Sequence, residues 1–531
     1  MHEIEVSSSD EIMGSVAIIQ MPDCEDDVAI VEATANPGYE FVNWAENNEV
    51  VSADATYSFE ATEDRSLVAV FRLSSALVFI GSETDHSWST ASNWNTNALP
   101  TETDDVFVNG ICELNGMAVV KSLTMNVGKS MAVKDGGILT VTEQLTTFDA
   151  SQLVVEDGGQ LVHNNNALAT VQKTINGFTG SNDNYYLIAS PVTDNTSVAN
   201  ITSNAYDLYT FDQTEELEWR NQQGNPAIAH KNGYLYANSG NVTLQFAGTV
   251  AASAEATPLD YEAGNDFTGF NLIGNPFPCN AYVESSYLRM NAEGTALMAG
   301  SGAVAPCEAV FVEATGENQS VTFSKTATRI NAINISVSKN RGAFFDRSIV
   351  RFDGKGDLHK MILNDDGAKL YIPQGGEDFA TICQQTNEGE IPVNFKAAQN
   401  GTYFITVDTE NLIVDYLHLV DNLTGADIDL LAASSYAFEA KASDYASRFK
   451  LVFSVNGDAA STGSAGDFAY ISNGEIIISN EGRATLQVID VMGRIVSSEE
   501  INGECRISTN GMTAGVYILN LNGKTQKIVV E

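Results

Sequence analysis

MAVKDGGILTV at residues 131–141 recurs as LVVEDGGQLVH at residues 153–163, 22 positions further along the chain. In both copies apolar residues alternate with other residues, and Asp-Gly-Gly separates two short apolar runs. A repeat of this length is typical of a stacked strand-turn coil, in which each coil buries its apolar row on the next coil. Only about two or three coils fit. We therefore predict a short β-helix or solenoid that packs against its neighbours.

The rest of the chain is patterned for strands as well. Short alternating runs bounded by Gly, Asn and Asp recur throughout, for example VNFKAAQNGTYFITVD at residues 393–408, whereas long windows with helical periodicity are scarce. The chain has 531 residues, and a single hydrophobic core stops growing near about 250 to 300 residues. The sequence therefore predicts an all-β protein with several domains.

The composition limits the kinds of partner. Acidic residues outnumber basic residues 69 to 27, which gives a net charge of −42. Such a surface repels nucleic acid and anionic membranes. No run approaches the ~18 apolar residues that a transmembrane helix needs. We expect no nucleic-acid partner and no transmembrane segment. The opening MHEIEVSSSDEIMG lacks the pattern of a signal peptide, so we expect either a trimmed N-terminus or a fragment of a longer protein.

The first module carries a family resemblance. GYEFVNW at residues 38–44, followed by YSFEATEDRSLVAVF at residues 57–71, resembles the internalin-type B repeat, a small β-grasp-like module. The resemblance implies a spacer or an adhesive unit of a bacterial surface protein. We assign this module to residues 1–74.

Two further modules follow. Residues 75–167 hold the 22-residue repeat, and WSTASNW at residues 88–94 resembles the opening of β-helix modules in bacterial surface proteins. Residues 168–332 contain an internal echo, because YYLIASPV at residues 185–192 matches FNLIGNPF at residues 270–277. Two related halves predict a β-sandwich. Phrases such as NLIGNPFPCNAYV resemble a module of secreted Bacteroidetes proteins.

Residues 333–456 show strands every 10 to 15 residues with Asn-Gly and Asp-Gly turns, which favours an immunoglobulin-like sandwich. After it, residues 457–466 are small and polar, so we predict a flexible linker there. The last module, residues 467–531, is then separate from the sandwich.

The last module resembles the type A sorting domain of type IX secretion cargo, which has an immunoglobulin-like fold. The matching stretches are EIIISN (475–480), ATLQVIDVMGRIV (484–496), CRISTNGMTAGVYILNL (505–521) and KIVVE (527–531). The resemblance implies that outer-membrane machinery recognises this domain and cuts it off. The mature protein is then released or joined to an anionic lipopolysaccharide. We therefore expect a secreted or cell-surface protein.

The motif positions of this signal transfer to individual residues. They are Asp490, Gly493, Arg494, Gly515, Tyr517 and Lys527. Gly493 permits the positive φ of a hairpin turn, and Gly515 lets a strand start tightly after Thr513.

One cysteine pair stands apart from the six cysteines of the chain. Cys279 and Cys307 lie in the same predicted module, and each follows a proline. They are either buried free thiols or a disulfide, which would contribute about 3 kcal/mol.

Candidate chemistry is sparse. The six histidines are isolated, and the chain has no HExxH, G-x-S-x-G or P-loop motif, so we expect no enzyme. The acidic turns DGKGD (353–357) and LNDDGAKL (363–370) lack EF-hand spacing, so solvated turns are favoured over calcium sites. We expect no cofactor, with calcium the one weak alternative. Trp219 in EELEWRN either binds a sugar ring or packs in a core.

These observations predict a non-enzymatic adhesive or scaffold protein, exported by its C-terminal module, that presents a face to a host protein or glycan. Two alternatives stay open. The chain could be the C-terminal accessory portion of a larger secreted peptidase or glycoside hydrolase, or it could be a carbohydrate-binding protein.

Overall fold

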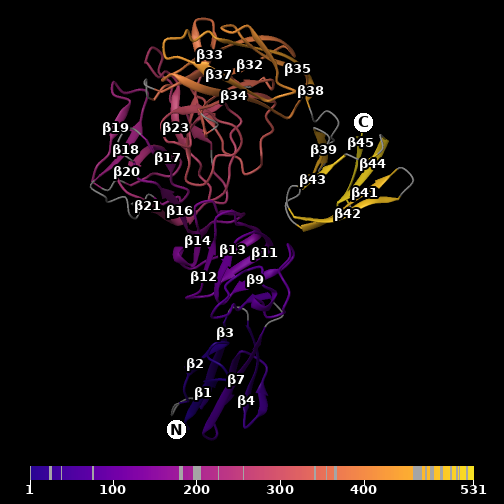
Figure 1. The fold of residues 1–531 in the computed structure, drawn as a ribbon. Helices are drawn as coiled ribbons and strands as arrows, with labels where there is room; N and C mark the ends of the chain where they lie inside the picture. Colours follow the sequence, from indigo (N-terminus) through magenta and orange to yellow (C-terminus); the bar gives the residue numbers. More distant parts are fainter. Residues whose placement is uncertain are drawn as a thin grey trace.

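The computed structural model confirms an all-β, multi-domain chain (Figure 1). Among the described residues, the only helical elements are two short 3-10 turns, η1 (Ala91–Asn93) and η2 (Ala150–Gln152). No helix in that part of the chain has the length and apolar character needed to cross a membrane. The structure describes residues 2–22, 27–36, 39–73, 77–178, 183–194, 205–224, 227–254, 256–339, 342–354, 356–363, 367–458, 469–472, 475–478, 483–490, 494–502, 505–509, 512, 515–521 and 524–530.

The N-terminal module consists of two facing sheets. The first sheet contains β1 (Ile4–Ser8), β7 (Arg65–Leu73), β4 (Tyr39–Glu46) and β5 (Glu49–Ser52), and the second contains β2 (Gly14–Gln20), β3 (Val28–Ala35) and β6 (Thr56–Glu60). β1 and β7 run parallel, and the other neighbours are antiparallel. Trp44 is fully buried in the shared core, and its indole N–H donates to the Ala55 carbonyl at 3.1 Å.

The solenoid forms two parallel sheets. One has the order β15 (Gln160–His163), β13 (Ile138–Thr146), β11 (Met117–Met125), β9 (Asp105–Val108) and β8 (Leu77–Phe79), and the other has the order β10 (Ile111–Leu114), β12 (Ser130–Val133), β14 (Leu153–Val155) and β16 (Ala167–Ile175). Met131 pairs with Leu153 and Leu139 with Leu161, which is the predicted 22-residue offset. Both pairs are buried because each coil covers the apolar row of the next.

The stack is longer than predicted. Four successive strand pairs, β9 with β10 through β15 with β16, follow one another where the sequence predicted about two or three coils. The earlier coils have shorter offsets, since Ile111 pairs with Ser130, and therefore do not align with the 22-residue repeat. Trp88 and Trp94 pack edge to face at 4.7 Å, and Trp94 lies against Phe79 of the outermost strand, β8. They cover that end of the stack.

The Asp-Gly-Gly corners require glycine. Gly136 and Gly158 have φ values of 75° and 86°, which L side chains rarely adopt. A Cβ atom at Gly158 would also lie 2.0 Å from the Asp135 carboxylate oxygen. The turns therefore stack closely only with glycine at these positions.

The middle region holds the predicted sandwich of two related sheets. The first has the order β17 (Tyr186–Ala189), β20 (Gly233–Asn238), β18 (Tyr206–Phe211) and β19 (Trp219–Asn221), and the second has the order β23 (Phe270–Gly274), β26 (Ala309–Glu313), β24 (Tyr287–Met290) and β25 (Leu297–Ala299). The equivalent residues Leu187 and Leu272 share one core. A Cβ atom at Gly274 would lie 2.2 Å from the Cβ of Ala189, its equivalent in the first copy. The two copies therefore meet at matching positions.

The next sandwich, which we call the last sandwich because only the small C-terminal module follows it, is one continuous sheet that folds around its own core. Its order is β36 (Ala426–Asp429), β35 (Leu412–Asp421), β38 (Phe449–Asp458), β33 (Glu388–Lys396), β31 (Lys369–Gln374), β32 (Glu377–Cys383), β29 (Phe344–Arg351), β28 (Ala332–Lys339), β34 (Gly401–Glu410) and β37 (Ser435–Ala440), with β30 (Leu358–His359) beside β32. The predicted linker begins inside β38, which continues to Asp458, and residues 459–466 lie outside the described residues.

The solenoid, the middle region and the sandwich that follows are joined through shared cores. The antiparallel strand β21 (Val242–Val250), from the middle region, closes the solenoid sheet against β16, and one apolar cluster runs from Phe79 to Cys307. A second cluster joins Leu288 of the middle region to Ile349 of the last sandwich. The predicted boundary at 167 therefore falls on the first residue of β16, and the predicted boundary at 332 falls on the first residue of β28. Each of these strands contacts the modules on both sides of the boundary. Figure 1 shows the N-terminal module, the solenoid and the sandwich region in succession.

Candidate functional site: the C-terminal module and the cavities of the sandwich region

The C-terminal module is a small sandwich. One sheet has the order β39 (Ala469–Ser472), β40 (Glu475–Ile478) and β43 (Cys505–Ser508), and the other has the order β42 (Ile495–Asn502), β41 (Arg483–Asp490), β44 (Gly515–Leu521) and β45 (Lys524–Val530). All neighbours are antiparallel. Ile476, Val488 and Leu519 are buried between the sheets. Alternating apolar residues on these short strands supply the core.

The structure brings the sequence-predicted signal residues to one end of the four-stranded sheet. β41 ends at Asp490, which pairs with Tyr517 of β44. Arg494 is exposed and directly precedes β42. β44 begins at Gly515, which pairs with Val530 near the end of β45. Because the strands are antiparallel, these termini share one end of the sheet.

The other two signal positions are Lys527 and Gly493. Lys527 lies on β45 opposite Ile518, one position further from that end than the Tyr517 pair. Gly493, predicted to form the hairpin turn, lies outside the described residues. The buried ring of Tyr517 is part of the module core, so this residue also serves packing.

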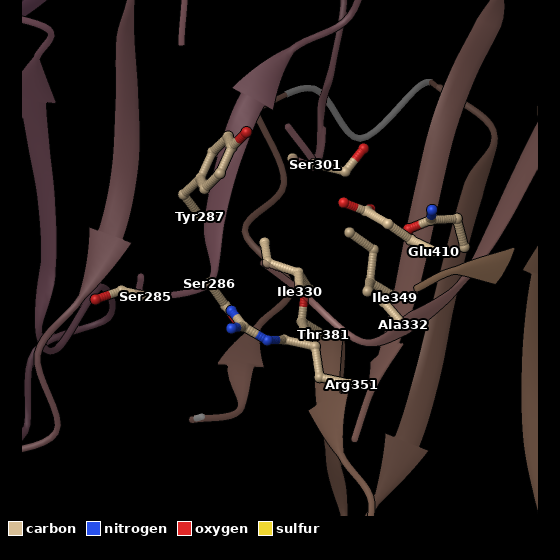
Figure 2. A pocket seen from close by; sticks show the side chains of 12 residues that line it. Ser285, Ser286, Tyr287, Ser301, Ile330, Ala332, Ile349, Arg351, Thr381 and Glu410 are labelled. Carbon is tan, nitrogen blue, oxygen red and sulfur yellow. The ribbon is translucent and has the colours of Figure 1, made fainter. Parts of the chain in front are cut away.

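A small cavity lies between the middle region and the last sandwich (Figure 2). Its volume is about 10 Å³, enough for a single water molecule. The Thr381 hydroxyl and the Asn334 amide oxygen are buried there without a hydrogen-bond partner among the described residues. Buried polar atoms of this kind usually bind ordered water. The cavity is therefore a water site and is too small for an organic ligand.

Arg351 fixes the wall of this cavity. Its buried guanidinium forms a two-pronged ion pair with Asp353 at 3.0 and 2.5 Å. It also donates to the Ser286 hydroxyl at 3.2 Å and the Glu284 carbonyl at 3.1 Å. Figure 2 shows Arg351 pointing toward Ser286 across the junction. The arginine therefore links β29 to the segment that precedes β24.

A larger groove of about 210 Å³ lies on the outer face of β33 and β38. The Lys450 and Glu390 side chains form an ion pair of 2.7 Å at this groove, and buried Phe449 is among its lining residues. Asn394 and Asn422 add amide groups. The groove offers amides and charges to a polar ligand.

The predicted alternatives for the cysteine pair are decided by the structure. Cys279 and Cys307 are both buried free thiols, so the disulfide alternative is corrected. The two side chains belong to different apolar clusters. The Asn275 amide bridges the carbonyls of Cys279 and Val304, each at 2.9 Å, and so joins the two segments without a covalent bond. Burial raises the pKa of Cys279 to about 11, which keeps this thiol protonated at neutral pH.

Trp219 lies in a packed aromatic cluster. Its ring meets Phe211 edge to face at 4.9 Å and Phe311 at 5.9 Å. It is partly buried against the core that joins the two middle sheets. These contacts favour the packing alternative over a sugar platform.

The structure separates Cys383 and His418, a thiol and an imidazole that could be imagined as a nucleophile and its base. Cys383 lies on β32 and His418 on β35, with β38, β33 and β31 between them in the sheet. Within the described ranges, no group of three His, Cys, Asp or Glu side chains could hold a metal ion. Of the predicted acidic turns, residues 355 and 364–366 lie outside those ranges, and so does Cys24.

His163 is buried at the junction between the solenoid and the middle region. Its Nδ1 lies 2.6 Å from the Asn165 carbonyl, and its buried Nε2 has no hydrogen-bond partner among the described residues. Burial lowers the pKa of His163 to about 4, and the nearby Lys325 ammonium acts in the same direction. The folded state therefore holds a neutral imidazole.

We expect this histidine to make stability depend on pH. The unfolded state takes up a proton near pH 6.5, whereas the folded state does so only near pH 4, so stability is full above about pH 6.5 and falls as the pH drops. The loss reaches roughly 3 kcal/mol by pH 4. Chemical unfolding at pH 7 and pH 4.5 should show this loss in the wild type and a smaller one in His163→Gln. The control variant His2→Gln, at a partly exposed histidine, should behave as the wild type, and equal losses in all three proteins would contradict the assignment.

A family described as "Secretion system C-terminal sorting domain" matches residues 472–531, the small sandwich whose signal residues share one end. The C-terminal module is a secretion-system sorting domain. The match confirms the type IX cargo predicted from Asp490, Arg494 and the terminal strand, and the protein is secreted or attached to the cell surface.

Two other family matches cover the N-terminal half of the chain. Residues 4–75 match a family described as "Divergent InlB B-repeat domain", which confirms the predicted first module. Residues 78–281 match a family described as a domain of unknown function (DUF8693). That match runs from the solenoid into the middle sandwich across the predicted boundary at 167.

Whole-chain comparisons are more distant. No curated protein matches this chain. A solved structure titled "Biofilm associated protein - BSP domain" is similar at 9% identity with a TM-score of 0.11, over 68% of this chain and 63% of that chain. The match thus spans less than two thirds of that protein, and it is too distant to bear on fold or function.

Proposed function

We propose that this chain is a non-enzymatic scaffold or adhesive protein of the bacterial surface. Its sorting domain directs export through the type IX machinery, and the preceding modules form an extended body that presents a binding face. The observation that carries the proposal is the sharing of cores between the solenoid, the middle region and the sandwich that follows it, because separate catalytic or hinge domains would not require such continuous packing. An adhesin needs a body that transmits force without bending.

Contacts at the first three junctions support this role. The Asn109 amide donates to the Tyr39 hydroxyl at 3.4 Å, between the first module and the solenoid. The Lys325 ammonium donates to the His163 carbonyl at 2.7 Å, between the solenoid and the middle region. The Asn291 amide donates to the Phe345 carbonyl at 3.0 Å, between the middle region and the last sandwich. The groove near Asn394 is the face we assign to a polar partner such as a glycan.

Deleting residues 467–531 should abolish delivery to the cell surface, because the deletion removes both sheets of the sorting domain. Surface protein would be measured by antibody binding to intact cells of the native host. The same cells should lose adhesion to protein-coated or glycan-coated surfaces. Normal surface delivery of the deletion would refute the export role. Unchanged adhesion of cells that lack the surface protein would refute the adhesive role.

A further inference from the structure

The sorting domain exposes apolar side chains at one place on its four-stranded sheet. Ile495 is 56% exposed, Val496 51% and Ile518 40%. The neighbouring residues Val488 and Leu519 point inward and are buried. Successive strand residues face opposite sides of a sheet, so Ile518 lies on the outer face, opposite to Leu519.

The strand register joins these residues into a row. Ile489 of β41 pairs with Ile495 of β42 on one side and with Ile518 of β44 on the other. Directly paired residues of an antiparallel sheet point to the same side. Ile495, Ile489 and Ile518 therefore form a continuous apolar row across three strands, and we call them the isoleucine row.

The isoleucine row lies at the signal end of the sheet. Ile489 directly precedes Asp490, and Ile518 directly follows Tyr517. The opposite end of the same face is polar, because Thr485 pairs with Glu500 there and donates to its carboxylate at 3.1 Å. Apolar exposure therefore coincides with the residues that identify the sorting domain. Exposed apolar patches on soluble domains mark contact surfaces.

We propose that the isoleucine row is the surface through which the sorting domain docks onto an apolar patch of the type IX outer-membrane machinery. This inference rests on the proposed function, since it assumes export through the sorting domain. The matched family is described as a sorting domain of a secretion system, and the machinery of such a system is the partner that reads a sorting domain. A membrane surface is a poorer occupant, because a chain with a net charge of −42 is repelled by anionic lipid.

The test is a double variant, Ile495→Thr with Ile518→Thr, in the full chain and the native host. Threonine keeps the β-branched shape that strands favour while removing apolar contact area. We expect at least a tenfold drop in surface protein, with accumulation inside the cell envelope. The matched control, Thr485→Ala with Glu500→Ala, changes the opposite end of the same face and should be exported normally.

A rescue variant separates docking from folding. Ile495→Val with Ile518→Val keeps the row apolar and should restore export to near the wild-type level. If the threonine and valine variants are exported equally, the inference is overturned. If thermal melting shows that the double threonine variant has unfolded, the single variant Ile518→Thr takes its place. Equal export of Ile518→Thr and the valine variant then overturns the inference.

The remaining outcomes distinguish this inference from the proposed function. If the deletion of residues 467–531 blocks export but the threonine variant does not, the isoleucine row is not the docking surface and the export role stands. If the deletion is exported normally, both proposals fail. Two other outcomes also overturn the inference. In one, the purified full chain binds phosphatidylcholine vesicles through the row, and in the other it forms dimers that the threonine variant abolishes.

Discussion

An Arg448→Ala variant should lose about 3 to 5 kcal/mol of unfolding free energy, since it leaves a buried carboxylate without its partner. The Arg448 and Asp421 side chains are 3% and 0% exposed, and two hydrogen bonds of 3.0 and 2.8 Å join them. The guanidinium also donates to the Glu439 carbonyl at 2.7 Å and lies 4.6 Å from the Phe438 ring. Denaturant unfolding of the full chain, followed by Trp and Tyr fluorescence, measures the loss.

A second ion pair, whose lysine lies two residues further along the chain, supplies the control. Lys450 and Glu390 are 35% and 63% exposed, so Lys450→Ala should cost at most about 1 kcal/mol. Equal losses for Arg448→Ala and Lys450→Ala would show that burial does not set the strength of these pairs.

Lowering the pH should reduce the free energy of unfolding for the same reason as Arg448→Ala, because it removes the charge of the partner, Asp421. Burial acts to raise the pKa of Asp421, but Arg448 outweighs it and holds that pKa below its usual value. The stabilisation is therefore present above about pH 4 and is lost as the pH falls through the folded-state pKa.

Asp346→Ala should also destabilise the protein by about 3 to 5 kcal/mol, at the junction of the two sandwiches. Asp346 and Lys360 are 2% and 3% exposed, and their charged atoms lie 2.5 Å apart. The carboxylate also accepts the Leu370 backbone N–H at 2.7 Å, and Lys360 donates to the Leu297 carbonyl of the middle region. The variant would leave a buried ammonium and a buried N–H without their acceptor.

A double variant tests the cause of that loss. Asp346→Leu with Lys360→Met replaces both charges by apolar side chains of similar size, and it should recover most of the stability lost in Asp346→Ala. Burial raises the pKa of Asp346, whereas the Lys360 ammonium lowers it, so the pair depends on both charges. If the double variant is as unstable as Asp346→Ala, the loss comes from packing and the ion pair is not its source.

The sequence predicted the elements that depend on neighbours close in the chain. The 22-residue repeat gave the correct pairing of Met131 with Leu153, because each coil meets the next one along the chain. The repeat did not reveal the first coils, because their spacing along the sequence differs from 22 residues. Stacked coils must match in register in space, and this does not require equal spacing along the sequence. The signal residues of the sorting domain were predicted from their order, and the family match confirms the domain that contains them.

The candidate site was harder to predict where residues distant in the chain meet. Cys279 and Cys307 looked equally able to pair, and only their placement in different cores shows them to be free thiols. The isoleucine row is scattered over residues 489, 495 and 518, and no sequence periodicity links strands that meet through hairpins and crossovers. The sequence signal that could have found it is Ile489, which follows the polar residues Thr485 and Gln487 at alternate positions of β41.

By itself, the sequence determined that the chain is a series of β modules ending in an export signal, because alternation, glycine turns and a terminal motif are local properties. Tertiary structure decided which charges are buried and paired, such as Arg448 with Asp421 across 27 positions. It also decided that the three central modules share cores and that the isoleucine row gathers at the signal end. Burial and register arise only when distant strands pack, so no single stretch of sequence contains them.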